Sequence, residues 1–145
     1  MKVVLQRVKK AQVKVREKIT GEIGEGLCLL VGVEKGDTEK DALYLADKIS
    51  GLRIFPDSEG KMNLSLQETG GEILAVSQFT LAGSVRKGRR PSFDRAERPD
   101  QAEKLFDCFV AQLRERSIKT ETGIFGEVMD VYLVNDGPVT FIISS

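Results

Sequence analysis

The first part of the chain has its apolar residues at strand spacing. Apolar and polar positions alternate loosely over residues 2–16, which predicts one long strand or two shorter ones. Residues 19–23 repeat this pattern and are expected to return beside that strand. Residues 27–33 are almost continuously apolar, which is typical of a central strand buried on both faces.

Two later stretches have the three- to four-residue spacing of an amphipathic helix. The first follows Asp37 and Thr38, either of which can act as an N-cap, and it ends at Gly51. The second begins at Pro99, a residue that suits the first turn of a helix. Its buried face is expected to contain Ala102, Leu105, Phe106, Phe109, Val110 and Leu113.

Shorter segments complete the pattern. Strands are predicted at residues 53–55, 61–66, 72–76, 118–121, 128–134 and 139–143. By spacing alone, the Asn-Asp-Gly-Pro sequence at residues 135–138 predicts a hairpin turn between the last two. The order of strands, helix, strands, helix and strands predicts one α+β domain over residues 1–145. We expect a largely antiparallel sheet with two main helices packed on it.

Composition restricts the possible functions. Apolar residues make up 41% of the chain and charged residues 30%, as in soluble globular proteins. The formal net charge is zero, so a polyanionic partner has to bind a local basic patch. We find neither a signal-peptide pattern nor an apolar run long enough to span a membrane, and therefore expect a cytoplasmic protein.

The chain contains no histidine. This excludes Ser-His, Cys-His and His-metal mechanisms, so any hydrolysis needs another proton acceptor. Cys28 and Cys108 cannot supply the usual zinc ligands without histidine, and both are expected to be small buried apolar residues. We expect no metal and no cofactor.

Polar side chains follow the strand at residues 72–76, where it leaves the core. Ser77, Gln78 and Thr80 stand there, just before a loop rich in Arg and Lys. Such a strand end suits a phosphorylated substrate. From these residues alone, however, ordinary solvent-facing positions are the favoured interpretation.

Residues 86–98 have a local excess of positive charge. Six basic residues stand against Asp94 and Glu97, and Phe93 lies among them as a ring that could stack on a base. The basic residues are Arg86, Lys87, Arg89, Arg90, Arg95 and Arg98. A nucleic-acid contact and a merely solvated loop are about equally favoured. Arg7, which lies among apolar residues, is by itself best interpreted as a surface charge on an edge strand.

Two segments are more specific together than any single pattern. They are Ser77-Gln78-Phe79-Thr80-Leu81 and Asn135-Asp136-Gly137-Pro138-Val139-Thr140. With them the chain closely resembles the D-aminoacyl-tRNA deacylases, once called D-tyrosyl-tRNA deacylases, from Met1 to the last strand. The resemblance includes Gln6-Arg7-Val8, Gly32-Val33-Glu34-Lys35-Gly36-Asp37, Lys61-Met62-Asn63-Leu64-Ser65 and Arg89-Arg90-Pro91-Ser92-Phe93.

The resemblance implies a homodimer that hydrolyses the ester of D-aminoacyl-tRNA as chirality proofreading of translation. Whether mischarged glycyl-tRNA is also a substrate stays open. The implied fold has two stacked sheets with helices on one side, in α/β/β layers. The resemblance further implies that Gly137-Pro138 has a cis peptide bond and enters the partner's pocket. It implies that Arg7 steadies this dipeptide across the interface and that Met129 lines the pocket.

An ester is reactive enough for positioning and oxyanion stabilisation to do most of the catalysis. The backbone N–H groups of Phe79 and Thr80 are the expected oxyanion donors, and Ser77 and Gln78 are expected to hold the substrate's amino group or terminal ribose. Thr80 lacks a histidine to activate it. We therefore favour attack by water, assisted by the 2′-hydroxyl of the tRNA. Phosphates of the tRNA are expected to contact Arg86, Lys87, Arg89 and Arg90.

Two other functions stay open. A non-catalytic RNA- or nucleic-acid-binding module would use the same basic loop and Phe93. The related editing domain of some threonyl-tRNA synthetases hydrolyses misacylated tRNA with the opposite chirality rule. The 145 residues contain no synthetase domain, which counts against this second alternative.

Overall fold

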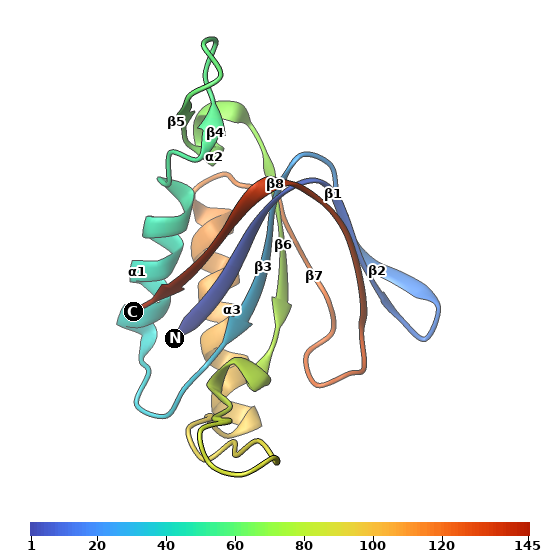
Figure 1. The fold of residues 1–145 in the computed structure, drawn as a ribbon, viewed down its shortest axis with the longest axis vertical. Coiled ribbons are helices and arrows are strands. Elements are labelled where there is room, and N and C mark those ends of the chain that lie inside the picture. The colour runs from blue at the N-terminus through green and yellow to red at the C-terminus, as the bar shows by residue number, and fades with distance from the viewer.

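A computed structural model describes residues 1–145. Strands and helices follow one another in nearly the predicted order (Figure 1). They are β1 (Lys2–Val15), β2 (Lys18–Ile23), β3 (Gly26–Gly32), α1 (Glu39–Ser50), β4 (Phe55–Pro56), β5 (Met62–Leu64), α2 (Leu66–Thr69), β6 (Glu72–Ser77), the 3-10 helix η1 (Phe79–Ala82), α3 (Pro99–Glu115), β7 (Thr120–Thr122) and β8 (Asp130–Ser144).

Strand β1 organises the sheet because it pairs with three other strands. Its first half pairs antiparallel with β3, and its second half pairs antiparallel with β2. Along its other edge it pairs antiparallel with β8, from Lys2 opposite Ser144 to Lys14 opposite Asp130. Arg7 therefore lies on an interior strand with 12% of its side chain exposed, and its interpretation as an edge-strand surface charge was wrong.

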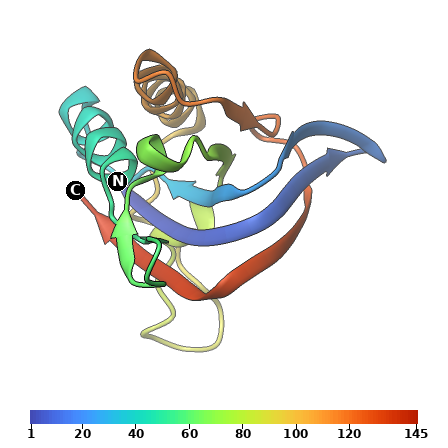
Figure 2. The same cartoon turned by 90° about the horizontal axis from the view of Figure 1, so that it is seen from above.

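The main sheet has six strands and curls strongly. Its order is β2-β1-β3-β6-β7, with β8 beyond β1. The pairs made by β1 are antiparallel, as predicted, whereas β3–β6 and β6–β7 are parallel. Figure 2 shows α1 and α3 together on one side, with β1 and β8 sweeping round the other. The predicted α+β fold, with stacked sheet layers and two main helices on one side, is confirmed.

The two main helices begin and end near the predicted residues. Thr38 caps α1, and Asp41 completes a capping box by accepting the Thr38 N–H at 2.8 Å. Pro99 begins α3. The short helix α2, capped by Ser65, replaces the end of the strand predicted at residues 61–66. None of the helices is long and apolar enough to cross a bilayer.

Apolar side chains form two clusters on opposite faces of the sheet. The larger lies between the sheet and the helices, and the smaller lies inside the curl. Strand β3 contributes Leu27 and Leu29 to the larger cluster and Cys28 to the smaller one. The prediction that this strand is buried on both faces is confirmed.

The hairpin turn predicted over residues 135–138 was wrong. Strand β8 continues through these residues without reversing. Asn135 lies opposite Val8 and Thr140 lies opposite Gln6, so residues 136–139 all face Arg7 and form a bulge. The sequence has turn chemistry, but both of its flanks pair with β1, and the chain cannot fold back. The Gly137–Pro138 peptide bond in the bulge is cis, as the resemblance implies.

The two thiols provide a test of this packing. Burial raises the pKa of Cys28 to about 11, and burial with nearby Glu39 and Glu115 also raises the pKa of Cys108. At about pH 8, roughly 0.1% of Cys28 is therefore thiolate, the nucleophilic form. We expect iodoacetamide to leave Cys28 unmodified in the native protein and to modify both cysteines in guanidinium, measured by peptide mass spectrometry. Alkylation of native Cys28 at the denatured rate would contradict this packing.

Candidate active site

A pocket of about 590 Å³ opens where β6 leaves the core. Its wall combines the ends of β3 and β6, the start of η1, the first turns of α3 and the segment before β8. Most of its lining is apolar, including Val31, Val76, Phe106, Phe125 and Met129. The polar lining side chains are Ser77, Gln78, Glu97 and Glu127. The pocket can therefore bury a flat apolar group while polar groups orient it at one end.

The 3-10 helix η1 follows Gln78 directly at the pocket. Leu81 donates its N–H to the carbonyl of Gln78 at 3.2 Å, and Gly83 donates to that of Thr80 at 3.0 Å. The N–H groups of Phe79 and Thr80 are the first two of the helix and have no acceptor inside it. A helix of four residues leaves no periodic signal, so the sequence did not predict it.

Among the predicted catalytic residues, Ser77, Gln78 and Phe79 line the pocket, and Thr80 stands beside it. The side-chain amide of Gln78 donates to Oγ1 of Thr80 at 2.6 Å. This is the only side-chain hydrogen bond of the Thr80 hydroxyl, so no base contacts it.

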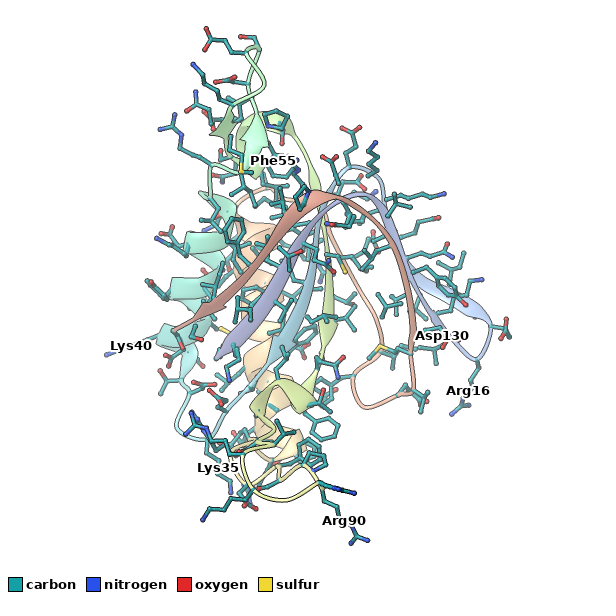
Figure 3. All side chains as sticks on the ribbon, in the orientation of Figure 1. Arg16, Lys35, Lys40, Phe55, Arg90 and Asp130 are labelled. Atoms are coloured by element: carbon teal, nitrogen blue, oxygen red, sulfur yellow. The ribbon has the colours of Figure 1, made fainter.

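The basic loop lies at the rim of the pocket. Ser84 and Ser92 exchange two backbone hydrogen bonds of 2.8 and 2.9 Å, which close the loop between them. Phe93 packs against Phe79 with ring centroids 5.0 Å apart, and both rings line the pocket. The side chain of Arg90 extends from the lower tip of the molecule, where Lys35 also lies (Figure 3). All four predicted phosphate-binding residues are exposed: Arg86, Lys87, Arg89 and Arg90.

Arg7 holds the bulge of its own chain. Its Nε lies 2.9 Å from Oδ2 of Asp136 and donates to the Asp136 carbonyl at 3.2 Å. Its Nη1 donates to the carbonyl of Ile54 at 2.5 Å. From the other side, the amide of Asn135 donates to the Arg7 carbonyl at 2.9 Å. Side-chain contacts thus fix the bulge on both flanks.

Within one chain, this bulge and the pocket lie well apart on the sheet. Ser77 pairs with Val31, Val31 pairs with Val3, and the bulge faces Arg7, four residues further along β1. That offset is roughly 13 Å along the strands, and the three intervening strand spacings add about 14 Å across the sheet. Gly137 and Pro138 therefore do not line the pocket of their own chain, whereas Met129 does.

Sequence reasoning did not single out several lining residues. The sequence predicts Phe106 only on the buried face of its helix and gives no signal for Phe125. The centroids of their rings lie 6.2 Å apart, and both rings line the pocket. Local patterns give no signal for this, because tertiary folding brings the two residues together.

Residues 4–144 match the family model described as D-Tyr-tRNA(Tyr) deacylase. The chain belongs to this family. The D-aminoacyl-tRNA deacylase of Geobacter sulfurreducens is 60% identical over 145 residues, covering 100% of this chain and 95% of that relative. The D-aminoacyl-tRNA deacylase of Bacillus velezensis is 58% identical, covering 100% and 99% of the two chains.

Two solved structures agree with the family fold. A protein described as c-Myc DNA unwinding element binding protein superposes with a TM-score of 0.93 and 41% identity, covering 100% of this chain and 99% of its own. A probable eukaryotic D-amino acid tRNA deacylase has a TM-score of 0.86 at 20% identity, covering 99% and 98%, which shows the fold alone. Both cover nearly the whole of this deacylase-family chain.

Proposed function

We propose that this protein hydrolyses the ester bond between a D-amino acid and the terminal adenosine of a tRNA. The match of residues 4–144 to the deacylase family carries this proposal. The products are a free D-amino acid and a tRNA that can be charged again, so the activity proofreads chirality in translation.

A second candidate is nucleic-acid binding without catalysis. The structure that is 41% identical belongs to a protein described as binding a DNA unwinding element, and this chain has four exposed basic residues at a pocket rim. Single-turnover deacylation separates the two functions. Purified protein should release D-tyrosine from D-tyrosyl-tRNA and leave L-tyrosyl-tRNA intact. A pure binding module would hydrolyse neither ester, and the opposite preference would indicate an L-specific editing enzyme.

The mechanism that we propose places water on the ester carbonyl. Oxygen of the water forms the new C–O bond, the bond to the ribose 3′-oxygen breaks, and the leaving oxygen takes a proton. The tRNA 2′-hydroxyl relays this proton from the attacking water to the leaving 3′-oxygen. The N–H groups of Phe79 and Thr80 would stabilise the oxyanion, and one such donor is typically worth about a hundred- to a thousandfold in rate.

A homodimer would complete the site, with Gly137-Pro138 of each chain entering the partner's pocket. The separation of bulge and pocket within one chain supports this proposal. The outer edge of β8 has no strand partner. Tyr132, Val134 and Ile142 on β8 are exposed apolar residues that a second copy would cover.

The main chain of Gly137-Pro138, acting as a rigid wall of the pocket, would let the enzyme distinguish D- from L-amino acids on the tRNA. A pocket that only fits a side chain separates two substrates by about 1–3 kcal/mol for each methylene by which they differ. This is too little to prevent hydrolysis of the abundant L-aminoacyl-tRNA. Main-chain atoms cannot change rotamer, so an L side chain would collide with them. Glycine has no Cβ to obstruct this approach, and proline fixes its own φ.

The first prediction concerns the basic loop. Arg86→Gln with Arg90→Gln should weaken tRNA binding and reduce the slope of log K against log salt by about 1.5, because two side chains no longer neutralise phosphates. The D/L preference should not change. Lys48→Gln with Lys61→Gln, on other exposed surfaces, is the charge-matched control. An unchanged salt slope with loss of D/L discrimination would assign the loop to the pocket instead.

The second prediction concerns Thr80. Because no base contacts its hydroxyl, Thr80→Ala should lose less than about tenfold in single-turnover rate. A tRNA ending in 2′-deoxyadenosine should lose about a hundredfold or more with the unmodified protein. Recovery of an acyl-Thr80 adduct by mass spectrometry would overturn this mechanism.

The third prediction concerns Gly137. We expect Gly137→Ala to fold and to dimerise in sedimentation velocity, yet to lose D-aminoacyl-tRNA hydrolysis, because the new methyl group intrudes on the partner's pocket. A folded, dimeric variant with normal D-specific activity would refute the proposal that the main chain at Gly137-Pro138 excludes L side chains.

A control is needed because the same methyl group would also overlap Oδ1 of Asn135 in its own chain. Asn135→Ala removes that internal obstacle, and because it also removes the amide that donates to the Arg7 carbonyl, the double variant is compared with Asn135→Ala alone. If the pocket is what the methyl group obstructs, Gly137→Ala stays inactive in the Asn135→Ala background. Recovery of activity there would mean that the damage is internal to the bulge.

A further inference from the structure

Glu34 is a mostly buried carboxylate behind the proposed active site, and the proposed hydrolysis does not use it. It lies two residues after the end of β3, with 14% of its side chain exposed. Its Oε1 atom is buried and accepts no hydrogen bond. A buried carboxylate is costly unless cations compensate it. Two cations, Lys2 and Arg95, face this oxygen.

Lys2 connects Glu34 to the 3-10 helix. Its Nζ lies 3.6 Å from Oε1 of Glu34 and donates to the carbonyl of Leu81 at 3.2 Å. Leu81 belongs to η1, whose first two N–H groups are the proposed oxyanion donors. A cation at a carbonyl near the end of this helix is favourable, and Glu34 keeps that cation in place.

Arg95 connects the same oxygen to the segment that returns from the basic loop. Its Nη2 lies 3.3 Å from Oε1 of Glu34. Its carbonyl accepts the N–H of Lys35 at 2.8 Å, and Glu34 and Ala96 form an antiparallel bridge. The returning segment is thereby attached beyond the end of β3.

Both connected segments are walls of the pocket. Phe79 of η1 lines it, and so do Ala96 and Glu97 of the returning segment. We propose that Glu34 is a positioning residue that sets the separation between η1 and the basic loop through Lys2 and Arg95. In this role, which rests on the proposed hydrolysis, it aligns the oxyanion donors with a tRNA that the loop holds.

The test is Glu34→Gln, which removes the charge and keeps the shape. We expect a folded protein whose single-turnover rate at saturating enzyme falls about tenfold, while half-saturation changes less than about threefold, because the variant misplaces the donors and leaves tRNA binding intact. Amide exchange of Leu81 and Gly83, whose N–H groups bond within η1, should become about tenfold faster. Glu59→Gln, which breaks an exposed ion pair in the β4–β5 hairpin, should change neither.

A folded Glu34→Gln protein with the original exchange and rate would overturn the proposal, as would a loss of thermal stability without a change in rate. If Glu34→Gln does not fold, Lys2→Met is the deciding variant, because it breaks only the connection to η1 and retains the Glu34–Arg95 pair. It should give the same faster exchange and slower rate, and original values would refute the proposal. Absence of deacylation by the unmodified protein would refute the proposed function instead, and the exchange measurement would still judge the role of Glu34.

Discussion

The pairing of β8 with β1 is the constraint on which the rest of the structure depends. This ladder fixes both flanks of the bulge, so residues 136–139 have to be accommodated opposite Arg7 alone. A slip of one residue would turn every side chain of β8 to the other face of the sheet. The cost of such a slip keeps the bulge at one position along β1. Because β8 covers the outer edge of β1, Arg7 becomes interior and can bind Asp136 and Ile54 together.

The same register separates the two motif segments. Strand β6 runs parallel to β3 and delivers Ser77 to the end where Val31 lies, whereas the bulge faces Arg7 near the other end. A single chain therefore carries the two parts of the proposed site at separate places on its sheet. In a twofold dimer, if one surface of the first subunit contacts another surface of the second, the reverse contact also forms. This symmetry would let the bulge of each chain meet the pocket of the other. Strand register and exposed apolar surface both support the proposed dimer.

Sequence predicted those elements whose signals are local. Thr38, Gly51 and Pro99 limit the two main helices, and the apolar run at residues 27–33 predicts a strand buried on both faces. The bulge could not be predicted, because its conformation depends on pairing with a strand more than a hundred residues earlier. The polar strand end at Ser77 was visible in the sequence, whereas Phe125 joins the pocket only through tertiary folding.

A site built from backbone N–H groups depends on its frame more strictly than a site with a side-chain nucleophile. A side chain can change rotamer, but a main-chain donor moves only with its segment, and errors of about 1 Å can cost a hundredfold in rate. Several contacts hold η1 accordingly. Gln78 donates its N–H to Val31 at 2.8 Å. A Cβ at Gly32 would lie 2.8 Å from the Leu81 side chain and 3.0 Å from the Gln78 carbonyl, so glycine permits this close approach. In the proposed mechanism, which has no histidine to activate a nucleophile, precise placement of these main-chain donors takes that role.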